Sequence, residues 1–130
     1  MANKTHDRLP LQVNAPAARF GNPVAAGADI RGGAMVALDA AGNAIPAAAA
    51  SPVMRGIALH PADNTDGAAG AVSVETSRGC WIVKNDGSVN RTHIGKPVHV
   101  IDDQTVGAAG TLVAGKCLDV TDGGVAVEIV

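Results

Sequence analysis

The segment 110–117, GTLVAGKC, has the spacing closest to a chemical motif, because it fits the GxxxxGK pattern of a phosphate-binding loop. In such a loop the residue after the lysine is a Ser or Thr that binds magnesium, and here it is Cys117. The loop must also open a helix whose N-terminal N–H groups face the phosphate. Residues 112–120 instead alternate like a strand and run into the turn sequence DGG. We therefore expect a strand through Lys116 and no nucleotide binding.

Three histidines and two adjacent carboxylates are the remaining candidates for a metal site or for catalysis. None of them has the short paired spacing that makes a metal site specific. The serines lie in turns or at alternating strand positions, without the Gly-x-Ser-x-Gly elbow of hydrolases. We expect surface imidazoles and a carboxylate turn, with no catalytic residue, no metal and no cofactor, so the chain is not expected to be an enzyme. The residues concerned are His60, His93, His99, Asp102 and Asp103.

Short alternating runs separated by turn residues fill most of the chain from residue 34 onward. In the last run Val125, Val127 and Ile129 should share one face, since strand side chains alternate with a period of two. Gly56 lies inside a predicted strand, where glycine usually marks a bulge or a close backbone approach. About eight short strands are typical of an all-β sandwich or partly closed barrel. The predicted strands are 34–38, 44–50 (a poor or edge strand), 53–59, 71–76, 80–84, 97–101, 112–120 and 125–130.

The composition indicates an aliphatic core and excludes several classes of partner. Hydrophobic residues make up 47% of the chain but aromatic residues only 2%, so the core must consist mainly of Ala, Val, Ile and Leu. A formal charge of −2 gives no electrostatic footprint for nucleic acid, and the aromatic platforms that bind single strands are nearly absent. No run approaches the roughly 18 apolar residues of a membrane span, and the N-terminus MANKTHDRLP lacks a secretory apolar stretch. Cys80 and Cys117 fall in predicted strands, where we expect small buried side chains; their spacing does not decide whether they pair.

Residues 1–27 differ from the rest of the chain and predict an extended N-terminal arm ahead of a single β domain, 28–130. They contain Pro10, Pro16 and Pro23 among scattered apolar residues, without any period. Proline removes a hydrogen-bond donor and biases the preceding residue toward extended backbone. One interpretation is a disordered terminus. The functional interpretation is a strap that becomes ordered against a partner.

Five segments together resemble the small capsid decoration, or cement, proteins of tailed bacteriophages. The shared pattern is a Gly followed by MVAL and a turn, then GIAL, a hydrophobic strand after Gly, PVHVIDD with TV, and AGK-LDV closing on VAVEIV. The run PVHVIDDQTV is the most specific piece. The resemblance covers residues 28–130, and the segments are GADIRGGAMVALDAAGNAIPA, RGIALHPADN, AVSVETSRGCWIV, IGKPVHVIDDQTV and LVAGKCLDVTDGGVAVEIV.

This resemblance implies a compact β-tulip-like fold, self-association, and attachment to the outer surface of the mature phage head. The implied role is mechanical: the protein would stabilise the shell by clamping neighbouring subunits of the major capsid protein. It would therefore be found in the virion, on the outside of the capsid, after assembly in the host cytoplasm. The residues do not distinguish a homotrimer from a dimer, and the trimer is taken from the resemblance alone.

Within this interpretation the arm is expected to carry the capsid contacts, because an extended segment can add a strand to an exposed sheet edge. The candidate anchors are Leu9, Leu11, Val13 and Phe20. Phe20 is the first of these because aromatic residues dominate interface hot spots; alternatively, it caps the domain's own core. Two other functions stay open, namely a different virion component, such as a head-fibre base or tail module, and a ligand- or nucleotide-binding enzyme domain.

Overall fold

The computed structural model describes residues 19–130, in which short β-strands account for nearly all regular structure. The all-β class predicted from the alternating runs is confirmed. The elements are β1 (Arg19–Pro23), β2 (Asp29–Ile30), β3 (Met35–Leu38), β4 (Ala44–Pro46), β5 (Val53–Ala58), β6 (Ala62–Asp63), β7 (Ser73–Ser77), β8 (Gly79–Asn85), the 3-10 turn η1 (Arg91–His93), β9 (Pro97–Asp102), β10 (Thr105–Gly107), β11 (Val113–Thr121) and β12 (Gly124–Ile129).

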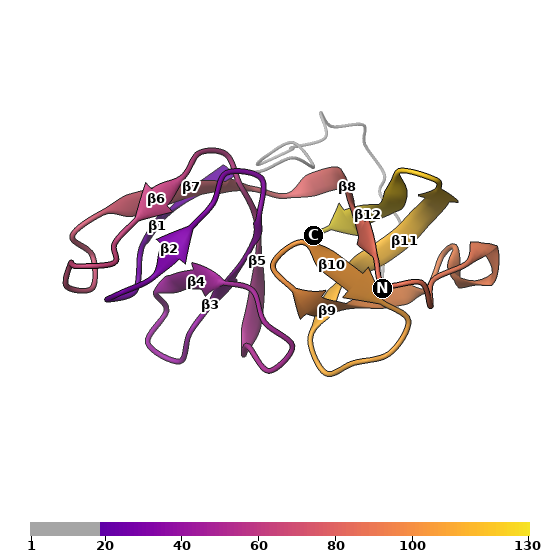
Figure 1. Ribbon diagram of the computed structural model, residues 1–130, viewed down its shortest axis with the longest axis horizontal. Helices are drawn as coiled ribbons and strands as arrows, with labels where there is room; N and C mark the ends of the chain where they lie inside the picture. The colour runs from indigo at the N-terminus through magenta and orange to yellow at the C-terminus, as the bar shows by residue number, and fades with distance from the viewer. Residues whose placement is uncertain (1–18) are drawn as a thin grey trace, which may run out of the picture.

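The strands form two lobes that lie side by side along the long axis of the molecule (Figure 1). The sheet lobe, residues 19–77, holds an antiparallel sheet in the order β1-β7-β5-β3-β4, with the small ribbon β2-β6 beside it. The barrel lobe, residues 79–130, is a closed barrel in the order β10-β8-β12-β11-β9. Its strand pairs are antiparallel except for β10 with β8. Strand β10, which the sequence did not predict, therefore closes the barrel.

The sheet lobe includes the part of the expected arm that the structure describes. Strand β1 pairs with β7 along its whole length, from Arg19 opposite Ser77 to Pro23 opposite Ser73. A proline is tolerated there because β1 is an edge strand. Beyond β1, the fully buried Val24 forms a bridge with Ala44 near the opposite edge of the sheet. Residues 19–27 thus belong to the sheet lobe, whereas the structure does not describe the arm residues 1–18.

Strand β3 joins the two lobes because its two faces are buried in different cores. Val36 packs in the core of the sheet lobe, whereas Met35 and Ala37 pack with the core of the barrel lobe. All three side chains are fully buried. The run MVAL has no polar residue, as expected for a strand covered on both faces. The N–H of Met35 also donates to the carbonyl of Asp103 at 2.6 Å, so the lobes form one packed body.

Two local predictions about the strands are confirmed. Gly56 lies at a register shift between β3 and β5, and a Cβ there would be only 2.7 Å from the carbonyl oxygen of Ser77. Only glycine allows β7 to approach this closely. In β12 the side chains of Val125, Val127 and Ile129 are all buried in the barrel. The period-two pattern therefore identified the inner face of the last strand.

The prediction that both cysteines are buried is wrong for one of them. Both are free thiols, but Cys117 is fully buried whereas Cys80 is exposed on β8. Alternation along β8 turns Trp81 and Val83 toward the barrel core and leaves Ile82 58% exposed. The run CWIV is apolar on both faces, so its sequence gives no signal for which face is inside.

Candidate binding surfaces

The segment with phosphate-loop spacing is part of the barrel wall. Lys116 lies in β11 opposite Glu128 of β12, and the strand continues to Thr121. The strand predicted through Lys116 is therefore confirmed, and this segment does not lead into a helix. Gly115 has a packing role instead, because a Cβ at this position would overlap the backbone carbonyl oxygen of Glu128.

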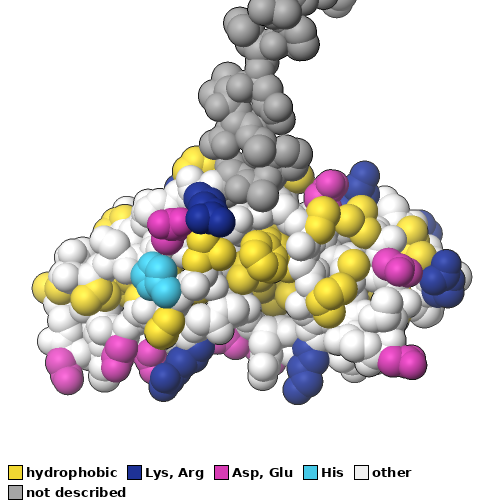
Figure 2. Space-filling view, turned by 90° about the horizontal axis from the view of Figure 1, so that it is seen from above, with side chains coloured by type: hydrophobic (Ala, Val, Ile, Leu, Met, Phe, Trp, Pro, Cys, Tyr) yellow, Lys and Arg dark blue, Asp and Glu magenta, His cyan; other side chains and the backbone are white. Residues whose placement is uncertain are grey.

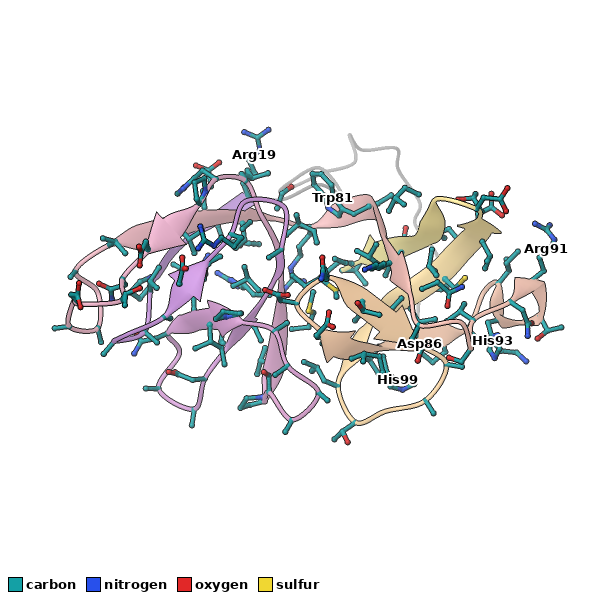
Figure 3. The ribbon with its side chains drawn as sticks, viewed as in Figure 1. Arg19, Trp81, Asp86, Arg91, His93 and His99 are labelled. Carbon is teal, nitrogen blue, oxygen red and sulfur yellow. The ribbon has the colours of Figure 1, made fainter. Side chains whose placement is uncertain are left out.

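The three histidines lie apart and serve local backbone contacts or none. Nε2 of His60 accepts a hydrogen bond from the N–H of Glu75 at 3.1 Å. Nδ1 of His93 accepts from the N–H of Asn90 at 3.0 Å and so helps to cap the turn η1. Figure 3 shows that His93 and His99 come from different segments at the barrel-lobe end. No group of three His, Cys, Asp or Glu side chains within residues 19–130 could hold a metal ion.

The two aspartates at the end of β9 lie in a turn that contacts the sheet lobe. Oδ1 of Asp102 accepts a hydrogen bond from the N–H of Gln104 at 2.9 Å. The carbonyl of Asp103 accepts the bond from β3 already described. Asp103 and Gln104 also line a recess of about 320 Å³ with residues 31–34. The Asp102 carboxylate thus stabilises the turn, and the backbone of Asp103 takes part in the packing of the lobes.

Phe20 lies in β1 and its half-buried ring is covered by two arginines of the same chain. The guanidinium carbon of Arg55 is 4.2 Å from the ring centroid, and that of Arg78 is 5.7 Å away. Both distances are within the range of cation–π interactions. Phe20 as an anchor for a partner remains a prediction. Outside the described residues lie the other three expected anchors, Leu9, Leu11 and Val13.

Arg55 is held in place by a buried hydrogen-bond network. Its Nε donates to Oδ1 of Asn22 at 2.7 Å. Asn22 is only 3% exposed, and its Nδ2 donates to the carbonyl of Val74 and the hydroxyl of Thr76, both at 3.1 Å. Burial, and secondarily the charge of Arg78, lowers the pKa of Arg55 from its ordinary value. An arginine nevertheless stays protonated in proteins, so the site carries positive charge at neutral pH.

Arg78 is the single residue between β7 and β8, at the point where the chain passes from one lobe to the other. Its carbonyl accepts hydrogen bonds from the hydroxyl of Ser77 at 2.9 Å and from Nε1 of Trp81 at 3.2 Å. Its own Nε is buried and has no hydrogen-bond partner among residues 19–130. Sequence reasoning missed Arg55 and Arg78. For Arg55 the available signal was a charge inside an otherwise apolar strand run, VMRGIAL, whereas Arg78 follows the polar residues ETS and gave no such signal.

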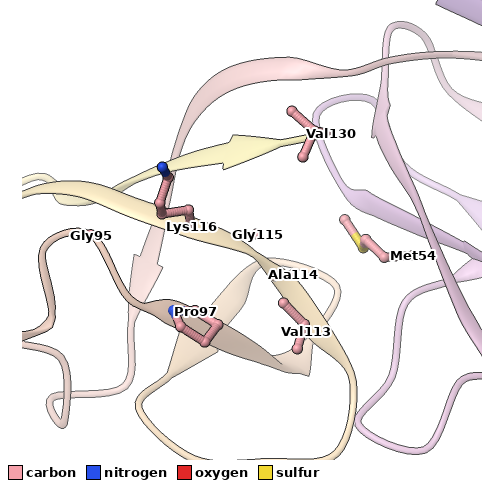
Figure 4. A pocket seen from close by; sticks show the side chains of 8 residues that line it. All are labelled: Met54, Gly95, Pro97, Val113, Ala114, Gly115, Lys116 and Val130. Atoms are coloured by element: carbon pink, nitrogen blue, oxygen red, sulfur yellow. The ribbon is translucent and has the colours of Figure 1, made fainter. Parts of the chain in front are cut away.

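An apolar groove of about 390 Å³ lies at the seam between the lobes (Figure 4). Met54 of β5 contributes from the sheet lobe, and β9, β11 and the C-terminal residue contribute from the barrel lobe. Val113 and Val130 in its lining are 45% and 77% exposed. Lys116 is the only charged residue of the lining, whose members are Met54, Gly95, Pro97, Val113, Ala114, Gly115, Lys116 and Val130.

Apolar side chains also gather on the face that carries β7 and β8. Figure 2 shows this face with hydrophobic groups across its middle and over the barrel lobe, and charged groups mostly toward its rim. Large aliphatic side chains are exposed elsewhere in both lobes as well. These groups are separated by other surface in Figure 2, so they do not define a single apolar patch. The exposed side chains are Val53, Leu59, Ile82, Ile94, Ile101, Val113, Leu118 and Val130.

Comparisons with known proteins found no relative of this chain. No protein-family model matches the chain, and neither the curated proteins nor the solved structures contain a match. Within residues 19–130 the structure contains no helix long and apolar enough to cross a membrane.

Proposed function

We propose that this protein is a decoration, or cement, protein of a tailed-phage head. It binds the outer surface of the mature shell and stabilises it by clamping neighbouring subunits of the major capsid protein. The resemblance over residues 28–130 and the all-β fold support this role. The self-association into trimers is part of the same proposal and rests on the resemblance alone.

The apolar groove at the lobe seam is the observation that carries the proposal. Met54, Val113 and Val130 present apolar surface to solvent next to a single lysine, which is an unfavourable arrangement for a surface that stays in water. We assign this groove to an apolar segment of one capsid subunit. Because the groove takes its lining from both lobes, a segment bound there would contact both lobes at once.

The arm supplies the second contact of the clamp. Residues 1–18, which include Leu9, Leu11 and Val13, precede β1 and are assigned to a neighbouring capsid subunit. A standard protein interface buries about 1,600 Å². One molecule that contacts two subunits would then raise the free energy needed to separate them by several kcal/mol, after the entropy of association is subtracted. Many copies acting together would oppose the pressure of packed DNA.

Binding to expanded, mature heads that lack the protein tests the proposal. The wild-type chain should co-sediment with the heads and raise the temperature at which they rupture. Val113→Asp should weaken binding about tenfold or more, because it places a charge in the groove. Thr111→Asp is the matched control, since Thr111 is an exposed residue outside the groove lining. It should bind like the wild type.

The arm is tested by deleting residues 1–18, which leaves β1 intact. A deletion through Gly27 would also remove β1 and the buried Val24, so loss of binding could then reflect loss of the fold. A wild-type protein that never sediments with heads would refute the capsid role. A copy number of only a few per particle would instead favour a head-fibre base or tail module.

A further inference from the structure

Two positive charges flank Phe20 without a negative charge to neutralise them among the described residues. Both guanidinium carbons lie within 6 Å of the ring centroid. Neither Arg55 nor Arg78 takes part in an ion pair within residues 19–130. Like charges at such a site repel each other unless an anion lies between or beside them. The ion pairs that the described residues do form are Arg19–Glu75, Arg31–Asp29 and Arg91–Asp119.

The neighbouring carboxylate of Glu75 is directed elsewhere by the strand geometry. Phe20 is opposite Thr76, and side chains alternate between the two faces of β7. Thr76 is buried, whereas Glu75 is exposed and pairs with Arg19 at 3.6 Å. The face of β7 that lies toward Phe20 and the two arginines therefore receives no carboxylate from this strand.

The site is organised before any ligand arrives. The bond from Nε of Arg55 to Asn22 and the stacking on Phe20 fix the guanidinium plane, while Asn22 is fixed by β7. Within residues 19–130 the terminal NH₂ groups of Arg55 make no hydrogen bond, and only its Nε is used, by Asn22. A guanidinium that is already oriented loses less side-chain entropy on binding than a free surface arginine.

The buried Nε of Arg78 points independently to a missing partner. Buried donors are nearly always hydrogen-bonded, and an unmade bond to a charged donor is costly. This donor belongs to one of the two arginines beside Phe20 and lacks a partner among the described residues.

We propose that Arg55 and Arg78 form a binding site for a carboxylate side chain of a partner protein. The planar carboxylate matches the planar fork of a guanidinium, which can donate two parallel hydrogen bonds. The naming of the major capsid protein as this partner rests on the proposed function. A nucleic-acid phosphate is disfavoured, because the whole chain carries a net charge of −2 and phosphate backbones are bound by extended basic surfaces.

Acetate titrated into the isolated, full-length protein tests the site without any capsid. We expect the Nε–H resonances of Arg55 and Arg78 to shift saturably in NMR spectra, while the resonance of Arg91 stays nearly constant. Arg78→Gln should abolish the acetate-dependent shift of Arg55. This variant should fold normally, because no hydrogen bond from the Arg78 side chain to residues 19–130 is lost. Absence of any saturable shift in the wild type would overturn the proposal.

Sedimentation with mature heads tests the partner. Arg78→Gln should weaken head binding about tenfold or more and make it less sensitive to salt, as expected when one member of a charge pair is removed. Arg91→Gln makes the same change of charge at the exposed pair with Asp119 and should leave binding within about twofold of the wild type.

Equal binding of heads by wild type and Arg78→Gln would reject a capsid carboxylate as the ligand but leave the decoration role standing. If the wild type shifts with acetate but does not bind heads, the decoration role fails and the carboxylate site survives.

Two further results would assign the site to a different occupant and so overturn the proposal. One is a stronger shift with inorganic phosphate than with acetate, together with competition by single-stranded DNA. The other is a change in the Arg55 and Arg78 resonances of the Asp7→Asn variant without acetate, which would mean that the chain's own N-terminal segment occupies the site.

Discussion

Replacing Gly124 with alanine should destabilise the protein by forcing apart β8 and β12, two neighbouring strands of the barrel. Gly124 is the buried first residue of β12 and has a φ of 137°. A Cβ at this position would overlap the carbonyl oxygen of Val83 in β8 and lie 3.1 Å from its carbonyl carbon. The next residue, Val125, pairs with Val83, so the obstructing atoms are backbone that can move only if β8 and β12 separate.

Two costs add in the Gly124→Ala variant. A non-glycine residue held at a sparsely populated backbone angle costs about 1–3 kcal/mol. Forcing a methyl group against fixed neighbours costs about another 1–3 kcal/mol. The sum is a large fraction of the roughly 5–15 kcal/mol by which small domains are stable. With about 2.1 cal/mol/K of unfolding entropy per residue, the melting temperature of a 130-residue chain should fall by roughly 7–22 °C.

The adjacent substitution Gly123→Ala is the matched control. Gly123 has no unusual φ, and a Cβ there would meet its nearest atom, Oγ1 of Thr121, at 3.7 Å. The free energy of unfolding of the Gly123→Ala variant should differ from that of the wild type by no more than about 0.5 kcal/mol. Urea unfolding can be followed through the fluorescence of Trp81, the only tryptophan, which lies in β8 beside the affected pair. Equal midpoints for wild type and Gly124→Ala, or equal losses in both variants, would refute this account of the contact between β8 and β12.

Three other predictions concern the core, the thiols and the pH dependence. Met35→Ala should lower the free energy of unfolding by about 2–5 kcal/mol in a single urea transition, because Met35 is fully buried where β3 meets the barrel core; two separate transitions would show that the lobes unfold independently. A maleimide should label the exposed Cys80 within minutes in native protein, whereas Cys117, whose thiol pKa is raised by burial, should react only on unfolding; equal labelling rates would contradict the barrel packing. Hydrogen bonds from the Ser88 hydroxyl and N–H lower the pKa of Asp86. The ionised Asp86 carboxylate therefore stabilises the folded protein above the ordinary carboxyl pKa of about 4, and this stabilisation is lost as the pH falls through the lowered pKa. The stability difference between wild type and Asp86→Ala should accordingly shrink in acid, and a difference that grows there would reverse the assigned sign.

The features of the fold that could be predicted from sequence are those that depend on the alternation of buried and exposed residues within one strand. Val125, Val127 and Ile129 alternate with more exposed residues, and the strand they form follows directly. Strand β1, RFGNP, gave no such signal, because it is held by backbone pairing with β7 and by the buried amide of Asn22. Strand β10 has only three residues and lies directly after a turn, so no period can develop in it.

The arginine site could not be found from spacing, because its residues are far apart in the sequence. Phe20, Arg55 and Arg78 come from β1, from β5 and from the link between β7 and β8. Only the register of these strands brings them together: Phe20 is opposite Thr76, and Thr76 is opposite Ala58. The register depends on close backbone approaches such as the one at Gly56. A glycine in a predicted strand indicates that such an approach occurs, but the sequence does not indicate which strand makes it.

The burial of β3 on both faces has a consequence for the proposed clamp. Met35 and Ala37 belong to one core and Val36 to the other, so the lobes cannot rotate about their seam without exposing one of these side chains to water. The groove at the seam and Arg78 at the passage between the lobes therefore keep fixed positions relative to each other. A partner that contacts both would not have to order the lobes on binding, and more of its contact energy would remain for holding capsid subunits together. On this argument, Met35→Ala should weaken binding to heads even where the variant stays folded, although Met35 lies in neither proposed contact.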